Sequence, residues 1–139
     1  MLSKNKNIAL VLLITALILS SCFMKQHATI NIVDIKTSIG VNDKLMPVRI
    51  TNSFPAGTQK VFCWFQWKNT KVSTMVVARW YFLTDDIHIL DYNFLIPRKE
   101  GTGSVSLTMP EGKQLPTGLY RVDLTLGKEI LKSDTFKVQ

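Results

Sequence analysis

Hydrophobic and polar side chains alternate along most of the chain after residue 28, and this alternation is typical of β-strands that bury one face. Residues 101–109 follow it strictly, because small hydroxyl side chains separate the apolar ones. The alternation predicts the following inward-facing residues: Ile30, Ile32 and Ile35; Val61, Cys63, Phe65 and Trp67; Val76, Ala78, Trp80 and Phe82; Val105, Leu107 and Met109; Tyr120, Val122, Leu124 and Leu126; Phe136 and Val138.

Turn-forming residues interrupt the alternation at intervals of roughly 10 to 15 residues, as in a sandwich or a barrel. We expect a turn at 40–43 and a loop at 53–57, and Pro47 suits an edge strand because it lacks a backbone N–H. No amphipathic helix of useful length follows residue 26. The pattern predicts an all-β domain of 7–9 strands, with strands at 29–37, 45–51, 59–68, 72–83, 87–96, 101–109, 118–126 and 130–138.

The N-terminal segment has a different character. Residues 8–21 carry no charge, Lys4 and Lys6 precede them, and Ser20 and Ser21 follow the apolar run. A basic start, a short apolar stretch and a small-residue exit are typical of a secretory signal peptide. As a helix the run would span about 21 Å, short of the roughly 30 Å of a bilayer core. Extended through Met24, it could also serve as an uncleaved anchor.

The residues Leu19-Ser20-Ser21-Cys22 resemble the lipobox of bacterial lipoproteins. The resemblance implies cleavage before Cys22 and diacylation of its sulfur. The lipid would anchor the protein to a membrane, with its domain outside the cytoplasm. The resemblance divides the chain into a signal-peptide helix at 1–21, a lipidated tether at 22–27 and a domain at 28–139. If the source is Gram-negative, Phe23 implies that the protein is located at the periplasmic leaflet of the outer membrane. The alternative is an ordinary signal peptide followed by a chance cysteine.

Two features of the predicted domain resemble immunoglobulin-like domains. The segment 115–122, Leu-Pro-Thr-Gly-Leu-Tyr-Arg-Val, resembles the tyrosine corner, in which the hydroxyl of a residue such as Tyr120 bonds to backbone just upstream. Cys63, Trp80 and Val122 follow the order of the immunoglobulin core, with Val122 in place of the second cysteine. The resemblance implies an antiparallel β-sandwich of immunoglobulin-like or fibronectin-III-like type without a disulfide. An up-and-down barrel is the alternative.

Composition and charge narrow the classes of function. Apolar residues make up 46% of the chain and charged residues 19%, as in globular proteins. Two cysteines and two histidines exclude a disulfide scaffold and a multi-cysteine zinc site. The net charge of +7 falls to +5 without the signal peptide. That charge suits anionic headgroups or cell-wall polymers, whereas scattered lysines outside the cytoplasm argue against nucleic acid.

The densest ionisable cluster is Asp85, Asp86, His88 and Asp91. Three carboxylates and an imidazole could ligate a divalent cation, but their spacing matches no calcium loop, and aspartates are common in solvated turns. The chain has no nucleophile-elbow, zinc-protease or phosphate-loop motif. We therefore expect no enzyme and no cofactor, and a metal-dependent protein is the weaker alternative.

A candidate binding surface comes from residues that point away from the predicted core. If the strands 59–68 and 72–83 are neighbours, their outward apolar side chains form one patch, beside two outward arginines. Such a patch would bind an envelope protein or a glycan ring, unless another part of the chain covers it. The sequence favours a binding or accessory module. The alternative is an envelope inhibitor or a chaperone-like lipoprotein that acts through loop 84–91 or loop 110–117. The residues concerned are Phe62, Trp64, Met75, Val77 and Tyr81, with Arg79 and Arg121.

Overall fold

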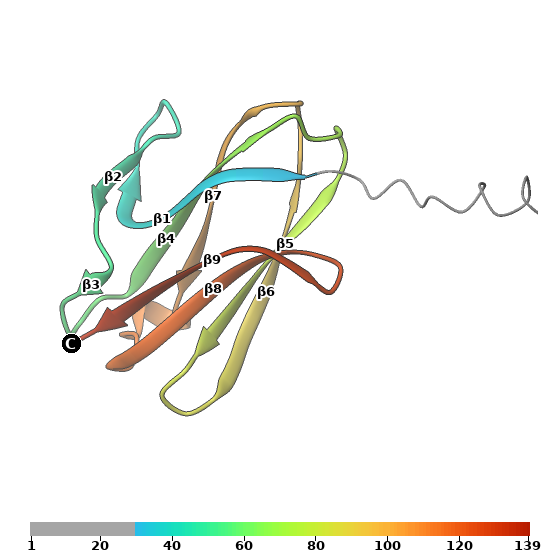
Figure 1. Ribbon diagram of the computed structural model, residues 1–139. Coiled ribbons are helices and arrows are strands. Elements are labelled where there is room, and N and C mark those ends of the chain that lie inside the picture. The colour runs from blue at the N-terminus through green and yellow to red at the C-terminus, as the bar shows by residue number, and fades with distance from the viewer. Residues whose placement is uncertain (1–29) are drawn as a thin grey trace, which may run out of the picture.

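The computed structural model describes residues 30–139, which form a two-layered β-sandwich (Figure 1). The expected signal peptide, the tether with Cys22 and the first two residues of the expected domain lie outside the described residues. Nine strands form the sandwich, so the expected all-β architecture is confirmed.

Each layer is one sheet. Sheet A has the strand order β2-β1-β4-β7, and all of its pairings are antiparallel. Sheet B has the order β3-β9-β8-β5-β6, and only β3 pairs in parallel, with β9. The strands are β1 Asn31–Val41, β2 Pro47–Ile50, β3 Ser53–Phe54, β4 Lys60–Lys68, β5 Met75–Phe82, β6 Ile87–Leu95, β7 Gly101–Thr108, β8 Gly118–Leu126 and β9 Glu129–Val138, with one 3₁₀ turn, η1 Pro110–Gly112.

The expected strands are present, with two differences at the N-terminal half. The segment 53–57 is not entirely a loop, because Ser53 and Phe54 form β3 and bury the Phe54 ring beside Phe136 at a centroid distance of 5.5 Å. The strand expected at 29–37 continues to Val41, through part of the expected turn. In β1 a bulge between Ile32 and Asp34 changes the alternation, so that Ile35 also packs against the core.

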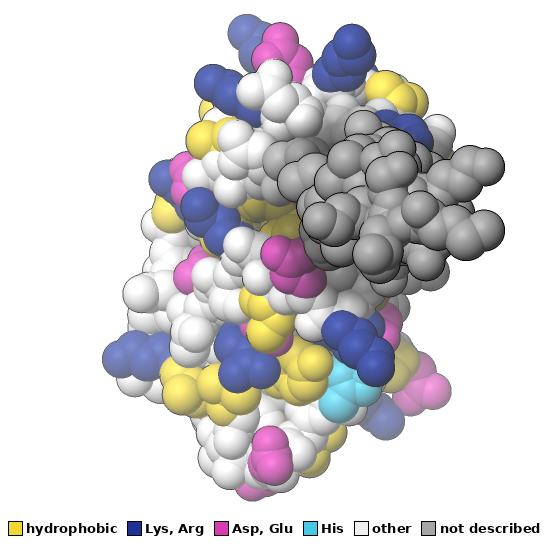
Figure 2. Space-filling view, turned by 45° about the vertical axis from the view of Figure 1, so that its right-hand side comes forward, with side chains coloured by type: hydrophobic (Ala, Val, Ile, Leu, Met, Phe, Trp, Pro, Cys, Tyr) yellow, Lys and Arg dark blue, Asp and Glu magenta, His cyan; other side chains and the backbone are white. Residues whose placement is uncertain are grey.

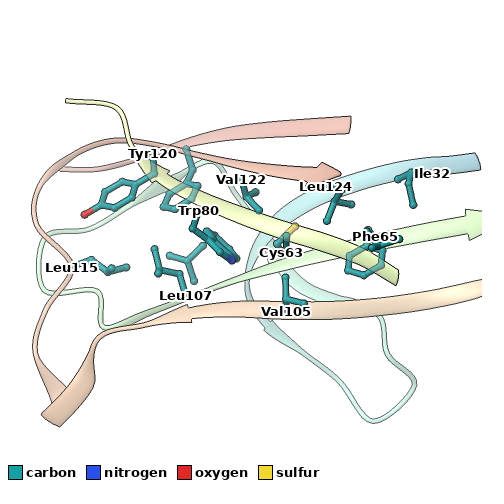
Figure 3. Packing of buried hydrophobic residues seen from close by; sticks show 14 of the residues in the cluster. Ile32, Cys63, Phe65, Trp80, Val105, Leu107, Leu115, Tyr120, Val122 and Leu124 are labelled. Atoms are coloured by element: carbon teal, nitrogen blue, oxygen red, sulfur yellow. The ribbon is translucent and has the colours of Figure 1, made fainter. Parts of the chain in front are cut away.

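The core lies between the two sheets and contains most of the residues that the alternation predicts, together with Phe54, Ile96 and Leu115, which it does not predict. Most of the predicted residues are buried, whereas Ile30, Ile35, Met109 and Leu126 are only partly buried. Cys63 from sheet A and Trp80 and Val122 from sheet B meet in the centre of this core (Figure 3). The Cys63 thiol is free, and burial, with a smaller contribution from the charge of Asp134, raises its pKa. Packing therefore holds the place that a disulfide occupies in antibody domains.

The tyrosine corner is also present. The Tyr120 hydroxyl donates a hydrogen bond of 2.6 Å to the backbone oxygen of Pro116, and burial raises the pKa of this phenol to about 12. The bond ties the entrance of β8 to the connection from β7. With the two separate sheets, it confirms the immunoglobulin-like sandwich over the alternative barrel.

Candidate binding surfaces

The single apolar patch expected from strands β4 and β5 does not exist, because these strands belong to different sheets. Phe62 and Trp64 lie on the outer side of sheet A, whereas the other members lie on the outer side of sheet B. The condition for a single patch, that these two strands are neighbours, is not met because the chain crosses from sheet A to sheet B between β4 and β5. The outer sides of the sheets are therefore separate candidate surfaces.

The β1–β2 hairpin covers Trp64, which is only 5% exposed. The Trp64 indole N–H donates a 2.7 Å hydrogen bond to the backbone oxygen of Leu45, and the Thr102 hydroxyl donates one of 3.2 Å to the same oxygen. Trp64 pairs with Lys36, well before the end of β1, so the hairpin has to fold back over sheet A to reach it (Figure 1). Trp64 thus holds the hairpin and is not available as a binding residue.

Phe62, the other candidate on sheet A, is partly buried. The Lys60 ammonium lies 4.6 Å from the centre of its ring, a contact that covers part of the ring with a charged side chain. Phe62 therefore contributes only partial apolar surface beside the hairpin.

The hairpin itself displays the hydrophobic side chains that sequence reasoning missed. They are between 41% and 58% exposed, although the backbone beneath them is held by Trp64. Leu45 and Arg49 have φ angles of 56° and 52°, a conformation that is uncommon in residues other than glycine and often marks functional segments. The signal in the sequence was the segment 45–50, which is apolar except for Arg49 and does not alternate. We call residues 39–50 the apolar hairpin, and its exposed members are Ile39, Leu45, Met46, Val48 and Ile50.

The outer side of sheet B brings together residues from two of the predicted sets. The Arg121 guanidinium stacks 4.8 Å from the centre of the Tyr81 ring, and Tyr81 lies 5.2 Å from the His88 ring. His88 Nε2 is 2.7 Å from a carboxylate oxygen of Asp91. In Figure 2 the imidazole, in cyan, adjoins basic and hydrophobic side chains on this surface. Arg79 stands opposite Asp91 in the strand register.

Asp123 organises this outer surface, and the sequence pattern did not single it out. Its side chain is 2% exposed although it lies on the outer side of β8. One of its carboxylate oxygens is 2.9 Å from Arg121 Nε and accepts a 2.6 Å hydrogen bond from Ser133. Arg79 donates to the backbone oxygen of Gly127 at 3.3 Å. The cations on this surface are therefore held by neighbouring groups, which orders the surface and leaves little free charge.

The four residues considered as an alternative metal site are not grouped around one point. Asp85 and Asp86 lie in the β5–β6 turn, whereas His88 and Asp91 pair with each other on β6. Within residues 30–139, no three histidine, cysteine, aspartate or glutamate side chains are placed to hold a metal ion together. Over the same residues, no helix has both the length and the apolar character needed to cross a bilayer.

The comparisons with known proteins agree with this fold. The described architecture is that of an immunoglobulin-like β-sandwich. A solved structure of an immunoglobulin-like protein from Pseudomonas aeruginosa is similar to this chain, with a TM-score of 0.56 over 82% of this chain and 99% of that one. The two sequences are 15% identical, so the similarity concerns the fold. No protein-family model matches the chain, and no curated protein matches it.

Proposed function

We propose that this protein is a lipid-anchored binding or accessory module of the bacterial cell envelope. It recognises its partner through its surface and does no covalent chemistry. The observation that carries the proposal is the apolar hairpin, because exposed hydrophobic side chains on a fixed backbone are typical of a docking surface. Its side chains are aliphatic, which favours a protein partner over a glycan, since sugar rings pack best on aromatic faces.

The anchoring part of the proposal rests on the sequence. The uncharged run 8–21 and the Leu19-Ser20-Ser21-Cys22 motif support export followed by acylation of Cys22. Two or more acyl chains would hold the protein stably at a membrane, because each buried methylene contributes about 0.8 kcal/mol. The tether 22–27 would then connect the lipid to the sandwich.

The chemistry of the described residues supports binding without catalysis. The buried Cys63 thiol has a raised pKa, which disfavours the reactive thiolate. His88, the one histidine among residues 30–139, contacts Asp91 and the Tyr81 ring on an outer sheet surface. Neither arrangement provides the nucleophile and neighbouring base that covalent catalysis requires.

Replacing Cys22 tests the anchor. Cys22→Ser should abolish labelling by a fatty-acid analogue and leave the protein unprocessed or released from the membrane fraction, because serine offers no thiol for acylation. Cys63→Ser is the matched control and should keep the label. A wild-type protein that takes up no label would exclude the lipoprotein proposal.

Charged substitutions in the apolar hairpin test the docking surface. Met46→Lys and Val48→Lys should lower crosslinked recovery of a specific envelope protein by about tenfold or more, because a charge then has to be buried at the interface. Ile130→Lys changes another exposed apolar residue, on sheet B, and should leave recovery unchanged. Circular dichroism should show all three variants folded. Equal recovery by hairpin and control variants would contradict the proposed role of the hairpin.

A further inference from the structure

The longest strand edge without a neighbour in sheet B belongs to β6. β6 pairs with β5 on one side, and among residues 30–139 no strand pairs with its other side (Figure 1). The strand runs for nine residues and contains neither lysine nor proline, two residue types that often protect edges. Its outward polar side chains, His88 and Asp91, contact each other, with His88 Nε2 2.7 Å from a carboxylate oxygen of Asp91. β6 therefore presents free backbone N–H and C=O groups that an extended chain could pair with.

An apolar pocket opens at the beginning of β6, between the edges of the two sheets. Its volume is about 160 Å³, and its wall exposes no polar surface. An apolar cavity of roughly 150 Å³ accommodates a benzene-sized group, so this pocket fits one leucine- or phenylalanine-sized side chain. We call it the edge pocket, and its wall includes Ile87 and Ile89 from β6, Phe82 and Tyr120 from the core, and Met109 and Leu115 from the β7–β8 connection.

Local backbone structure explains why the pocket lies at this end of β6. A bulge places Ile89 as an extra residue between the pairs that Leu90 and His88 make with β5, so both Ile87 and Ile89 reach the inner side. At the other end of the strand, the Phe94 ring fills the same gap. It packs 5.0 Å from the centre of Phe65 and leaves no space for a Cβ atom on Gly103 of β7. The gap between β6 and β7 is therefore closed at one end and open at the other.

The surroundings of the edge pocket specify the charge of its occupant. Asp85 and Asp86 immediately precede Ile87, both are exposed, and neither forms an ion pair among the described residues. Figure 2 shows acidic side chains at the lower end of the molecule, where Figure 1 has the β5–β6 turn. They stand out on a chain with a net charge of +7. A lysine or arginine next to the inserted side chain would complement them.

We propose that the free edge of β6 binds an extended segment of a partner protein, which adds a strand to sheet B and inserts one apolar side chain into the edge pocket. A basic residue beside that side chain would meet Asp85 and Asp86. Main-chain pairing supplies affinity in this mode of recognition, and the pocket supplies specificity. The half-exposed Ile87 and Tyr92, which project from the inner side of β6, would be covered by the added strand. This site is separate from the apolar hairpin, so it goes beyond the function proposed above.

Selection from a phage-displayed library of random linear peptides tests the proposal. The bait is the full-length protein in phospholipid nanodiscs, with empty nanodiscs as background. The enriched peptides should share a leucine or phenylalanine next to a lysine or arginine. Their affinity should fall by about tenfold or more for Ile87→Arg and for Asp85→Lys with Asp86→Lys. Ile130→Arg replaces another exposed isoleucine, on β9, and should bind the peptides as the wild type does.

Several outcomes would overturn the proposal. One is a selection without this consensus, and another is a set of peptides that bind Ile87→Arg as tightly as the wild type. Sedimentation velocity could also show that the wild type is a dimer and that Ile87→Arg is a monomer. This result would assign the edge to a second copy of the chain. Binding of a medium-chain fatty acid to the wild type but not to Ile87→Arg, together with a selection that enriches no peptide, would assign the pocket to an acyl chain. Because the hairpin variants do not touch this edge, their results stand apart from these.

Discussion

Trp80→Ala should lower the free energy of unfolding by about 3–5 kcal/mol, the usual cost of emptying a large aromatic site. Trp80 is fully buried, it packs 6.2 Å from Phe136, and it lies beside Cys63 in the centre of the core. No disulfide ties the two sheets at this point, so packing is the interaction that the substitution removes. Urea denaturation followed by circular dichroism measures the effect.

Two controls separate packing from other effects of Trp80. The indole N–H of Trp80 has no hydrogen-bond partner among the described residues, and Trp80→Phe removes this unpaired donor together with part of the ring. This variant should lose less stability than Trp80→Ala, because the phenyl ring still fills most of the site. Tyr92→Ala removes an aromatic side chain from the exposed edge of β6 and should change stability by about 0.5–1 kcal/mol. A Trp80→Ala variant as stable as Tyr92→Ala would contradict the central role of Trp80.

Gly118→Ala should be the most damaging single-methyl substitution at the tyrosine corner, at about 2–6 kcal/mol. Gly118 has a φ of 147°, which costs a residue with a side chain about 1–3 kcal/mol. A Cβ atom there would also lie 2.5 Å from a ring carbon of Phe82 and 2.6 Å from Thr84 Oγ1, and such overpacking costs about 1–3 kcal/mol more. The same hydroxyl accepts a hydrogen bond from the Leu119 backbone N–H at 2.9 Å.

Gly112→Ala is the control for the backbone strain that a positive φ imposes on a residue with a side chain. Gly112 also has a positive φ, 67°, but a Cβ atom there meets no heavy atom within 4 Å. It should cost only about 1–2 kcal/mol, the penalty of the left-handed conformation. Chemical denaturation of both variants measures the difference, which isolates the contact with Phe82 and Thr84. Equal losses in the two variants would show that this contact adds nothing.

The core and the tyrosine corner could be predicted from the sequence because both depend on local order along one strand. Alternation places Cys63 and Trp80 inside regardless of which strands are neighbours. The Tyr120 hydroxyl bonds to a backbone atom only four residues away, so its motif is contained in a short segment. Strand bounds were correct to within a few residues for the same reason.

The candidate sites could not be predicted in this way, because they depend on which strands meet. β4 and β5 are neighbours in the sequence but lie in different sheets, which divided the expected patch. Trp64 is buried because the β1–β2 hairpin bends over it, and its hydrogen bond to Leu45 joins residues 19 positions apart in the sequence. Asp123 takes an outward position in the alternation of β8, which is typical of a solvated residue, yet Arg121 and Ser133 cover it.

The sequence by itself determined the class of fold, the composition of the core and the expectation of an exported, lipid-anchored chain. These follow from side-chain periodicity and short motifs, which act over a few residues. Only the tertiary structure decided which apolar side chains remain exposed on the apolar hairpin, and where the edge pocket opens beside β6. Whether these side chains are exposed depends on which segments, distant in the sequence, pack over them. Such contacts form only when the two sheets assemble.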